Sequence, residues 1–138
     1  MKNIYTDKVY YADTDAYGVV WHGAYLRMME KGRVLFCDEA GLDLVTLKQQ
    51  DILIPVTNIN IKYKSSAKIE ERYTVITTVS KKTPLSITFH QIIENTETGK
   101  IYTEADVTVV AVNNEGKLYR RLPEVLSNAL QEETLCNV

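Results

Sequence analysis

Residues 20–41 read VWHGAYLRMMEKGRVLFCDEAG, and this stretch decides the fold class. Its apolar and small residues recur at the three- and four-residue spacing of one helix face. These residues are Tyr25, Met28, Met29, Gly32, Leu35, Phe36 and Ala40. Gly41 is suited to end the helix in a left-handed conformation. The pattern predicts one long amphipathic helix, and Gly32 in its interior indicates close approach to a sheet, because glycine otherwise costs about 1 kcal/mol there.

The rest of the chain predicts mostly β-structure around this helix. The first eleven residues favour a strand, and turn-forming residues 13–18 follow it. After the helix we expect a short helix from Asp43, as its N-cap, to Gln50. Four strands are then predicted at 54–63, 71–79, 85–94 and 101–113. Tight turns are predicted at 95–99 and 113–116, and a last helix at 123–130. Strands joined by tight turns run antiparallel, so the expected class is α+β, with one long central helix against an antiparallel β-sheet.

Length and composition indicate one globular domain spanning residues 1–138, with a frayed tail at about 132–138. The net charge of −2 argues against a nucleic-acid partner. No stretch approaches the roughly 20 apolar residues of a membrane span, and the first residues lack the apolar core of a secretion signal. Two distant cysteines give no disulfide framework, so the expected location is the cytoplasm.

The last long strand predicts self-association. Residues 107–112 read VTVVAV, which is apolar on both faces rather than alternating. One helix can cover only one face of a sheet. We therefore expect a second copy of the chain to cover the other, giving a homo-oligomer.

Several chemistries lack their motifs. The sequence has no G-x-S-x-G nucleophile elbow, no G-x-x-x-x-G-K-[ST] and no G-x-G-x-x-G. Its two histidines and two cysteines do not have metal-ligand spacing, so no metal site is expected. Cys37 lies beside core positions of the predicted helix and is interpreted as a small buried hydrophobe.

Residues 11–25, YADTDAYGVVWHGAY, are the most informative segment. A carboxylate precedes a glycine turn that leads into the long helix. A helix start offers unpaired N–H groups and a partial positive charge, which suit an oxygen that becomes negative in a transition state. A nearby carboxylate and histidine could act as base or nucleophile. The alternative is that Asp13 or Asp15 merely caps the helix and that His22 is a surface residue.

Residues 10–25 closely resemble the signature Y-Y-x-D-T-D-x-x-G-V-V-Y/W-H-x-x-Y of hotdog-fold acyl-CoA thioesterases of the 4-hydroxybenzoyl-CoA thioesterase family, YbgC-type subfamily. The resemblance continues at 30–33 and, more loosely, at 59–63 and 121–123. It implies a hotdog fold, in which an antiparallel sheet wraps a long helix. It also implies hydrolysis of an acyl-CoA thioester to a carboxylic acid and free CoA.

The resemblance assigns roles to four residues. Asp15 corresponds to the catalytic carboxylate, as general base or as nucleophile. His22 corresponds to the residue at the helix start, whose backbone N–H polarises the carbonyl. Tyr11 corresponds to an active-site tyrosine, and Gly18 allows the turn that brings Asp15 to the helix end. In the family the site lies at a dimer interface, CoA binds on the surface, and dimers often pair into tetramers.

The remaining candidate substrate-binding residues are Tyr17, Trp21, Gly23, Tyr25, Lys62 and Lys64. Tyr17 stands where relatives have a small residue, so the acyl pocket or the turn is expected to differ. Tyr25 lies on the apolar stripe and is interpreted first as core. Lys62 and Lys64 could meet CoA phosphates, although a solvated charged face explains them equally well.

The leading hypothesis is an acyl-CoA thioesterase that needs no metal or redox cofactor, because the CoA thiolate is already a good leaving group. Its expected partners are a small-molecule acyl-CoA, or an acyl carrier protein, and further copies of itself. Two alternatives are a non-catalytic acyl-CoA or acyl-carrier-protein binding module and a hotdog enoyl-thioester hydratase. The His/Asp and His/Glu arrangements of the hydratases are not found in this sequence.

Overall fold

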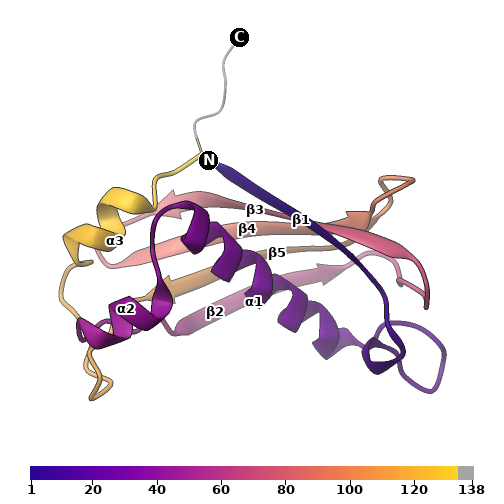
Figure 1. Ribbon diagram of the computed structural model, residues 1–138, viewed down its shortest axis with the longest axis horizontal. Helices are drawn as coiled ribbons and strands as arrows, with labels where there is room; N and C mark the ends of the chain where they lie inside the picture. The colour runs from indigo at the N-terminus through magenta and orange to yellow at the C-terminus, as the bar shows by residue number, and fades with distance from the viewer. Residues whose placement is uncertain (134–138) are drawn as a thin grey trace, which may run out of the picture.

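The computed structural model describes residues 1–133 and consists of one antiparallel sheet with helices on one face (Figure 1). The five strands are ordered β1-β3-β4-β5-β2. The elements are β1 (Lys2–Lys8), the 3₁₀ helix η1 (Tyr11–Asp13), α1 (His22–Glu39), α2 (Leu44–Gln49), β2 (Val56–Tyr63), β3 (Arg72–Lys82), β4 (Ser86–Asn95), β5 (Ile101–Val110) and α3 (Glu124–Ala129). The predicted α+β class and the long helix against an antiparallel sheet are confirmed.

Strand ends differ from the sequence predictions where pairing, rather than propensity, decides them. The first strand ends at Lys8, and Tyr11 lies in η1 instead of the strand. The third strand runs on to Lys82 because a bulge after Val79 lets it continue pairing with β4. The last strand ends at Val110, beyond which Val112 forms only isolated bridges to Leu53 and Leu118.

The predicted close approach at Gly32 is confirmed. A Cβ atom there would lie 2.7 Å from Thr77 Oγ1, 2.9 Å from Gln91 Nε2 and 3.0 Å from Val75 Cγ1. Gln91 Nε2 donates to the carbonyl of Met29 at 2.8 Å and to Thr77 Oγ1 at 2.9 Å. Helix α1 therefore rests on β3 and β4 through a buried polar contact that leaves no room for a side chain.

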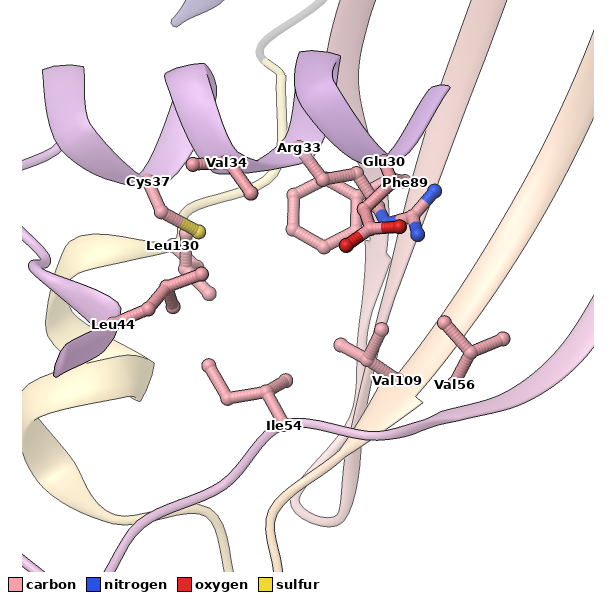
Figure 2. Close-up of a pocket in the computed structure, with 10 residues that line it drawn as sticks. All are labelled: Glu30, Arg33, Val34, Cys37, Leu44, Ile54, Val56, Phe89, Val109 and Leu130. Atoms are coloured by element: carbon pink, nitrogen blue, oxygen red, sulfur yellow. The ribbon is translucent and has the colours of Figure 1, made fainter. Parts of the chain in front are cut away.

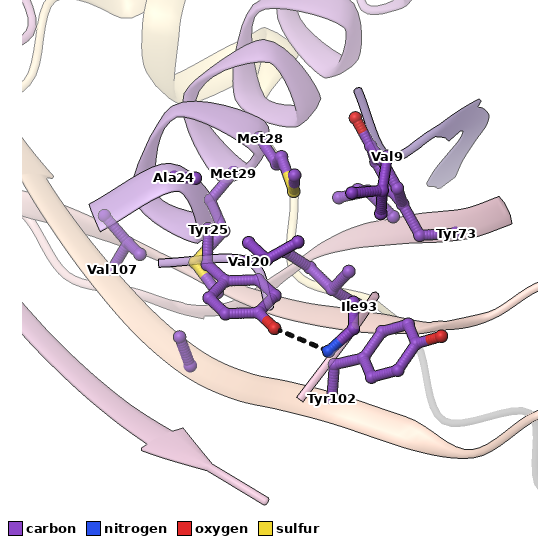
Figure 3. Packing of buried hydrophobic residues seen from close by; sticks show 13 residues of the cluster. Val9, Val20, Ala24, Tyr25, Met28, Met29, Tyr73, Ile93, Tyr102 and Val107 are labelled. Carbon is purple, nitrogen blue, oxygen red and sulfur yellow. Dashed lines mark hydrogen bonds between the residues drawn. The ribbon is translucent and has the colours of Figure 1, made fainter. Parts of the chain in front are cut away.

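Two hydrophobic clusters fill the space between α1 and the sheet. The first lies under the N-terminal half of α1 and includes Tyr25, Met28 and Met29 (Figure 3). The second lies under the C-terminal half, includes Phe36 and Cys37, and is closed by α2 and α3. The predicted cap is present, since the Asp43 carboxylate accepts from the Thr46 amide.

No helix of residues 1–133 lies on the other face of the sheet (Figure 1). On β4, buried residues alternate with half-buried ones along the whole strand. On β5 the outward residues are Glu104, Asp106, Thr108 and Val110, of which Asp106 is exposed and the other three are half-buried. A single chain thus covers one face only, and the prediction that a second copy covers the other stays a prediction.

The described end of the chain is attached to the sheet. The Glu133 amide donates to the Val79 carbonyl, and the Glu132 carboxylate accepts from the Lys82 amide, each at 2.8 Å. The rest of the predicted frayed tail, 134–138, lies outside the described residues. Within residues 1–133, no helix is both long and apolar enough to cross a membrane.

Candidate active site

The segment between η1 and α1 folds as a tight turn that carries Asp15. The Asp15 amide donates to the Val19 carbonyl at 2.9 Å, and the Gly18 amide donates to the Asp15 carbonyl at 3.0 Å. Thr14 and Val20 form an antiparallel bridge at its base. Gly18 has φ = +77°, a left-handed conformation that favours glycine. Gly18 thus allows the turn, and the expectation that the turn brings Asp15 to the start of α1 stays a prediction.

Neither aspartate caps α1. The N-cap residue is Trp21, and it makes no side-chain cap hydrogen bond. Asp15 is exposed, and its Oδ1 accepts from the Tyr17 amide at 2.8 Å within the turn. The Asp13 carboxylate is buried and contacts Tyr10 and Arg27. The interpretation of Asp13 or Asp15 as a helix cap is therefore wrong.

The start of α1 presents unpaired donors. In the described part of the chain, the amides of His22 and Gly23 donate to no acceptor. These N–H groups carry the partial positive charge of the helix N-terminus, which attracts an anionic oxygen. The His22 ring is exposed and packs against the Trp21 indole at 5.7 Å. The Trp21 ring lies over Gly23, where a Cβ atom would overlap it.

A cavity of about 340 Å³ opens beside His22. It is lined by Val20, His22, Tyr25, Tyr63, Lys64, Ser65 and Ser66. The Tyr63 hydroxyl donates to the His22 carbonyl at 3.0 Å, and the Ala67 amide donates to the Tyr25 hydroxyl at 3.0 Å (Figure 3). Burial raises the pKa of Tyr25, so this hydroxyl stays neutral. The cavity thus joins the start of α1 to the loop after β2.

The structure brings His22, Tyr25 and Lys64 together around this cavity. The predicted residues that do not line it are Tyr11, Asp15, Tyr17, Gly18, Trp21, Gly23 and Lys62. Tyr11 and Tyr17 are strongly exposed, at 80% and 90%. Tyr25 is both core and cavity wall, in agreement with its first interpretation.

The two lysines occupy different surroundings. Lys64 Nζ lies 2.7 Å from Glu104 Oε2, and the hydrogen bond from Lys64 lowers the pKa of Glu104. Lys62 lines a separate small cavity on the uncovered face of the sheet, with His90, Glu104 and Asp106 among its neighbours. His90 lies 3.0 Å from Asp106 and 3.2 Å from Glu104. In a single chain, therefore, Lys64 is ion-paired and Lys62 lies away from His22.

The lining residues that were not among the predicted site residues are Val20, Tyr63, Ser65 and Ser66. The signal for Tyr63 is weak, because only the pairing of β2 with β5 brings it to the start of α1. Its ring lies 5.8 Å from that of Tyr25. The one feature of the sequence that points to this contact is that a tyrosine ends both the signature, at Tyr25, and the strand β2, at Tyr63.

A second cavity, of about 250 Å³, lies at the other half of α1 (Figure 2). Its wall is mostly apolar and includes Val34, Cys37, Leu44, Phe89, Val109 and Leu130. Burial raises the pKa of the Cys37 thiol to about 11, which supports its interpretation as a small hydrophobe. Among residues 1–133, no three or more His, Cys, Asp or Glu side chains cluster as metal ligands would.

Residues 9–130 match the model of the Thioesterase-like superfamily. The chain belongs to this superfamily. A Haemophilus influenzae protein named acyl-CoA thioesterase YbgC is 33% identical over 108 residues, 77% of each chain. An Escherichia coli O6:H1 protein named acyl-CoA thioester hydrolase YbgC is 29% identical over 117 residues, 85% of this chain and 87% of the relative.

Among solved structures, a 1,4-dihydroxy-2-naphthoyl-CoA thioesterase from Synechocystis matches this chain with a TM-score of 0.85. The match covers 94% of this chain and 96% of that chain at 23% identity, so it shows the fold alone. The predicted hotdog fold is confirmed. The predicted family, with its YbgC-type relatives, and the predicted enzyme class, a thioester hydrolase, are confirmed as well.

Proposed function

We propose that this thioesterase hydrolyses a small-molecule acyl-CoA to a carboxylic acid and free CoA. The observation that carries the proposal is that, in the described part of the chain, the His22 and Gly23 amides at the start of α1 are unpaired, and that an exposed carboxylate, Asp15, lies in the turn that leads into this helix. The YbgC relatives, named as acyl-CoA thioesterases, support the substrate class.

The start of α1 stabilises the transition state in this proposal. The thioester oxygen becomes negative when a nucleophile adds to the carbonyl carbon. The His22 and Gly23 amides donate to that oxygen, and the helix dipole adds to the stabilisation. The His22 ring, packed on Trp21, orients the substrate or the attacking water.

Asp15 acts as general base or as nucleophile. As a base it takes a proton from water, which attacks the carbonyl carbon and expels the CoA thiolate. As a nucleophile it displaces the thiolate and forms a mixed anhydride, which water then hydrolyses. Neither route needs a metal or a redox group, because the thiolate leaves readily. We therefore expect the rate to be insensitive to a chelator.

We also propose that the active form is a homo-oligomer, as a dimer or a dimer of dimers, with a second copy beside the Asp15 turn. Two features support this. Tyr11 and Tyr17 are large side chains left exposed near Asp15, and β2 is an edge strand whose residues are almost all exposed. An edge strand with free backbone groups favours pairing with another chain.

The test is a thiol-release assay over a panel of acyl-CoAs and one acyl carrier protein thioester, run on the wild type and on Asp15→Asn. Loss of an acid–base group typically costs about 100-fold or more in kcat. We expect that loss with an unchanged Tm, because Asp15 is exposed and bonded only within its turn. Near-normal turnover by Asp15→Asn would refute the role of Asp15.

The same panel separates the alternatives. Binding of acyl-CoA by the wild type without thiol release would indicate a binding module. Addition of water to the double bond of an enoyl-CoA would indicate a hydratase.

A further inference from the structure

Asp13 is buried at the base of the turn that carries Asp15. Its exposed fraction is 3%. One carboxylate oxygen, Oδ2, accepts from the Tyr10 amide at 3.0 Å. The other, Oδ1, is paired with the guanidinium of Arg27 in α1. A buried carboxylate is tolerated only when it is paired and hydrogen-bonded, and both conditions are met here.

The backbone of Asp13 adds two connections. Its amide donates to the Tyr10 carbonyl, and its carbonyl accepts from the Trp21 amide, each at 3.0 Å. Asp13 therefore joins the segment after β1, the N-cap of α1 and, through Arg27, the second turn of α1. The Thr14–Val20 bridge follows immediately.

Within residues 1–133, Asp15 makes no hydrogen bond to α1. Its side chain accepts only from the Tyr17 amide, and its backbone bonds only to Val19 and Gly18 in the turn. The turn continues along the chain into α1 and is closed by the Thr14–Val20 bridge, and Asp13 is the residue that ties its base to the helix by side-chain and backbone contacts. Positioning matters in such a site, because a displacement of about 1 Å can cost about 100-fold in rate.

We propose that Asp13 and Arg27 are positioning residues for the reaction, and that their ion pair holds the Asp15 turn against the start of α1. This inference rests on the proposed role of Asp15. It differs from a purely structural role, in which loss of the pair would lower stability and leave turnover by the folded protein unchanged.

The chain offers a less buried aspartate–cation pair one helical turn away as a control. Asp7 Oδ1 accepts from the Lys8 amide at 2.8 Å, and Asp7 Oδ2 lies 3.9 Å from Lys31 Nζ in α1. Like Asp13, Asp7 thus accepts from a nearby backbone amide and faces a cation on α1. No bond of this pair reaches the Asp15 turn.

The experiment measures kcat, KM and Tm by thiol release and thermal unfolding for Asp13→Asn, Arg27→Met and Arg27→Lys, with Asp7→Asn and Lys31→Met as controls. We expect kcat to fall about tenfold or more in Asp13→Asn and Arg27→Met, with KM changed by less than about threefold. Arg27→Lys, which keeps the charge, should recover part of kcat. Both control variants should keep kcat within about twofold of the wild type.

A double mutant gives the decisive readout. In an Asp15→Asn background, Asp13→Asn should leave the residual rate unchanged within about twofold, because the residue that it positions is already gone. If Asp13→Asn instead caused a general loss of structure, it would lower the rate by the same factor in the wild-type and in the Asp15→Asn background.

The inference is overturned if Asp13→Asn and Arg27→Met keep wild-type kcat while Asp15→Asn loses it, or if the two losses multiply in the double mutant. If Asp13→Asn or Arg27→Met does not fold, Arg27→Lys decides alone, since lysine keeps a cation beside the buried Asp13 carboxylate; wild-type kcat in Arg27→Lys would then overturn the inference. Wild-type activity in Asp15→Asn would instead overturn the proposed function, and this inference with it.

Discussion

Gly32 is the residue at which the packing of α1 on the sheet is tightest. In an exposed helix, Gly→Ala stabilises by up to about 1 kcal/mol. Here the new Cβ atom would lie within 3.0 Å of Thr77, Gln91 and Val75. Overpacking of this kind typically costs about 1–3 kcal/mol. We expect Gly32→Ala to lower the free energy of unfolding, measured by urea denaturation, whereas Lys31→Ala on the exposed face should change it little. A stabilised Gly32→Ala would show that α1 is not held so close.

Tyr25 links stability to the candidate site. Its hydroxyl accepts from the buried Ala67 amide at 3.0 Å. In Tyr25→Phe that amide loses its acceptor, which costs about 1–3 kcal/mol. We expect a lower Tm together with a raised KM, because the loop at 64–67 forms one wall of the cavity beside His22. An unchanged Tm would mean that the Ala67 amide finds another partner.

At this scale the sequence predicts the residues whose surroundings are local. Asp15 and Gly18 lie in one turn, and His22 begins the helix that follows it. A short sequence motif is therefore enough to predict that these residues are close together along the chain. Tyr63 could not be found in this way. Its hydroxyl reaches the His22 carbonyl across 41 residues of sequence, through strand pairing that no local pattern encodes.

The Asp43 cap of α2 makes the free energy of unfolding of the protein depend on pH. The Thr46 hydroxyl donates to Asp43 Oδ2 at 2.6 Å, and this hydrogen bond lowers the pKa of Asp43. A carboxyl group whose pKa is lower in the folded than in the unfolded protein stabilises the folded state at pH values above its unfolded-state pKa. This contribution is lost as the pH falls through the folded-state pKa. We expect the wild type to lose more stability than Asp43→Asn between pH 6 and pH 3, since asparagine still caps but does not ionise. Equal losses, measured by urea denaturation at each pH, would contradict this role.

Except for η1, the elements were predictable in type and order, because the helical pattern of 20–41 is long and the strands are separated by clear turn signals. Their ends were less so. Tyr10 and Tyr11 favour a strand by propensity. The Asp13 carboxylate nevertheless accepts a hydrogen bond from the Tyr10 amide, and the chain forms the 3₁₀ helix η1 from Tyr11. The bulge after Val79 likewise depends on the partner strand β4.

For the whole molecule, the unpaired edge of β2 predicts association. Ile59 lies on this strand with 40% of its surface exposed. We expect light scattering to give a mass at least twice the 15.7 kDa of one chain for the wild type. Ile59→Lys should shift the mass toward that of one chain and lower thiol release, because a charge opposes burial at an interface.

The matched control for this test is Ile4→Lys on β1, the opposite edge strand, where Ile4 is 57% exposed. This variant should keep the wild-type mass and rate. A wild type of one-chain mass, with full thiol release, would remove the need for a second copy.

The chain has a single tryptophan, Trp21, and it sits at the N-cap of α1 with its indole against His22. An unlabelled sample therefore carries its own fluorophore at the point where the carbonyl is expected to bind. Because the rest of the sequence has no competing indole, stopped-flow emission could time ligand arrival and product departure separately from bond cleavage.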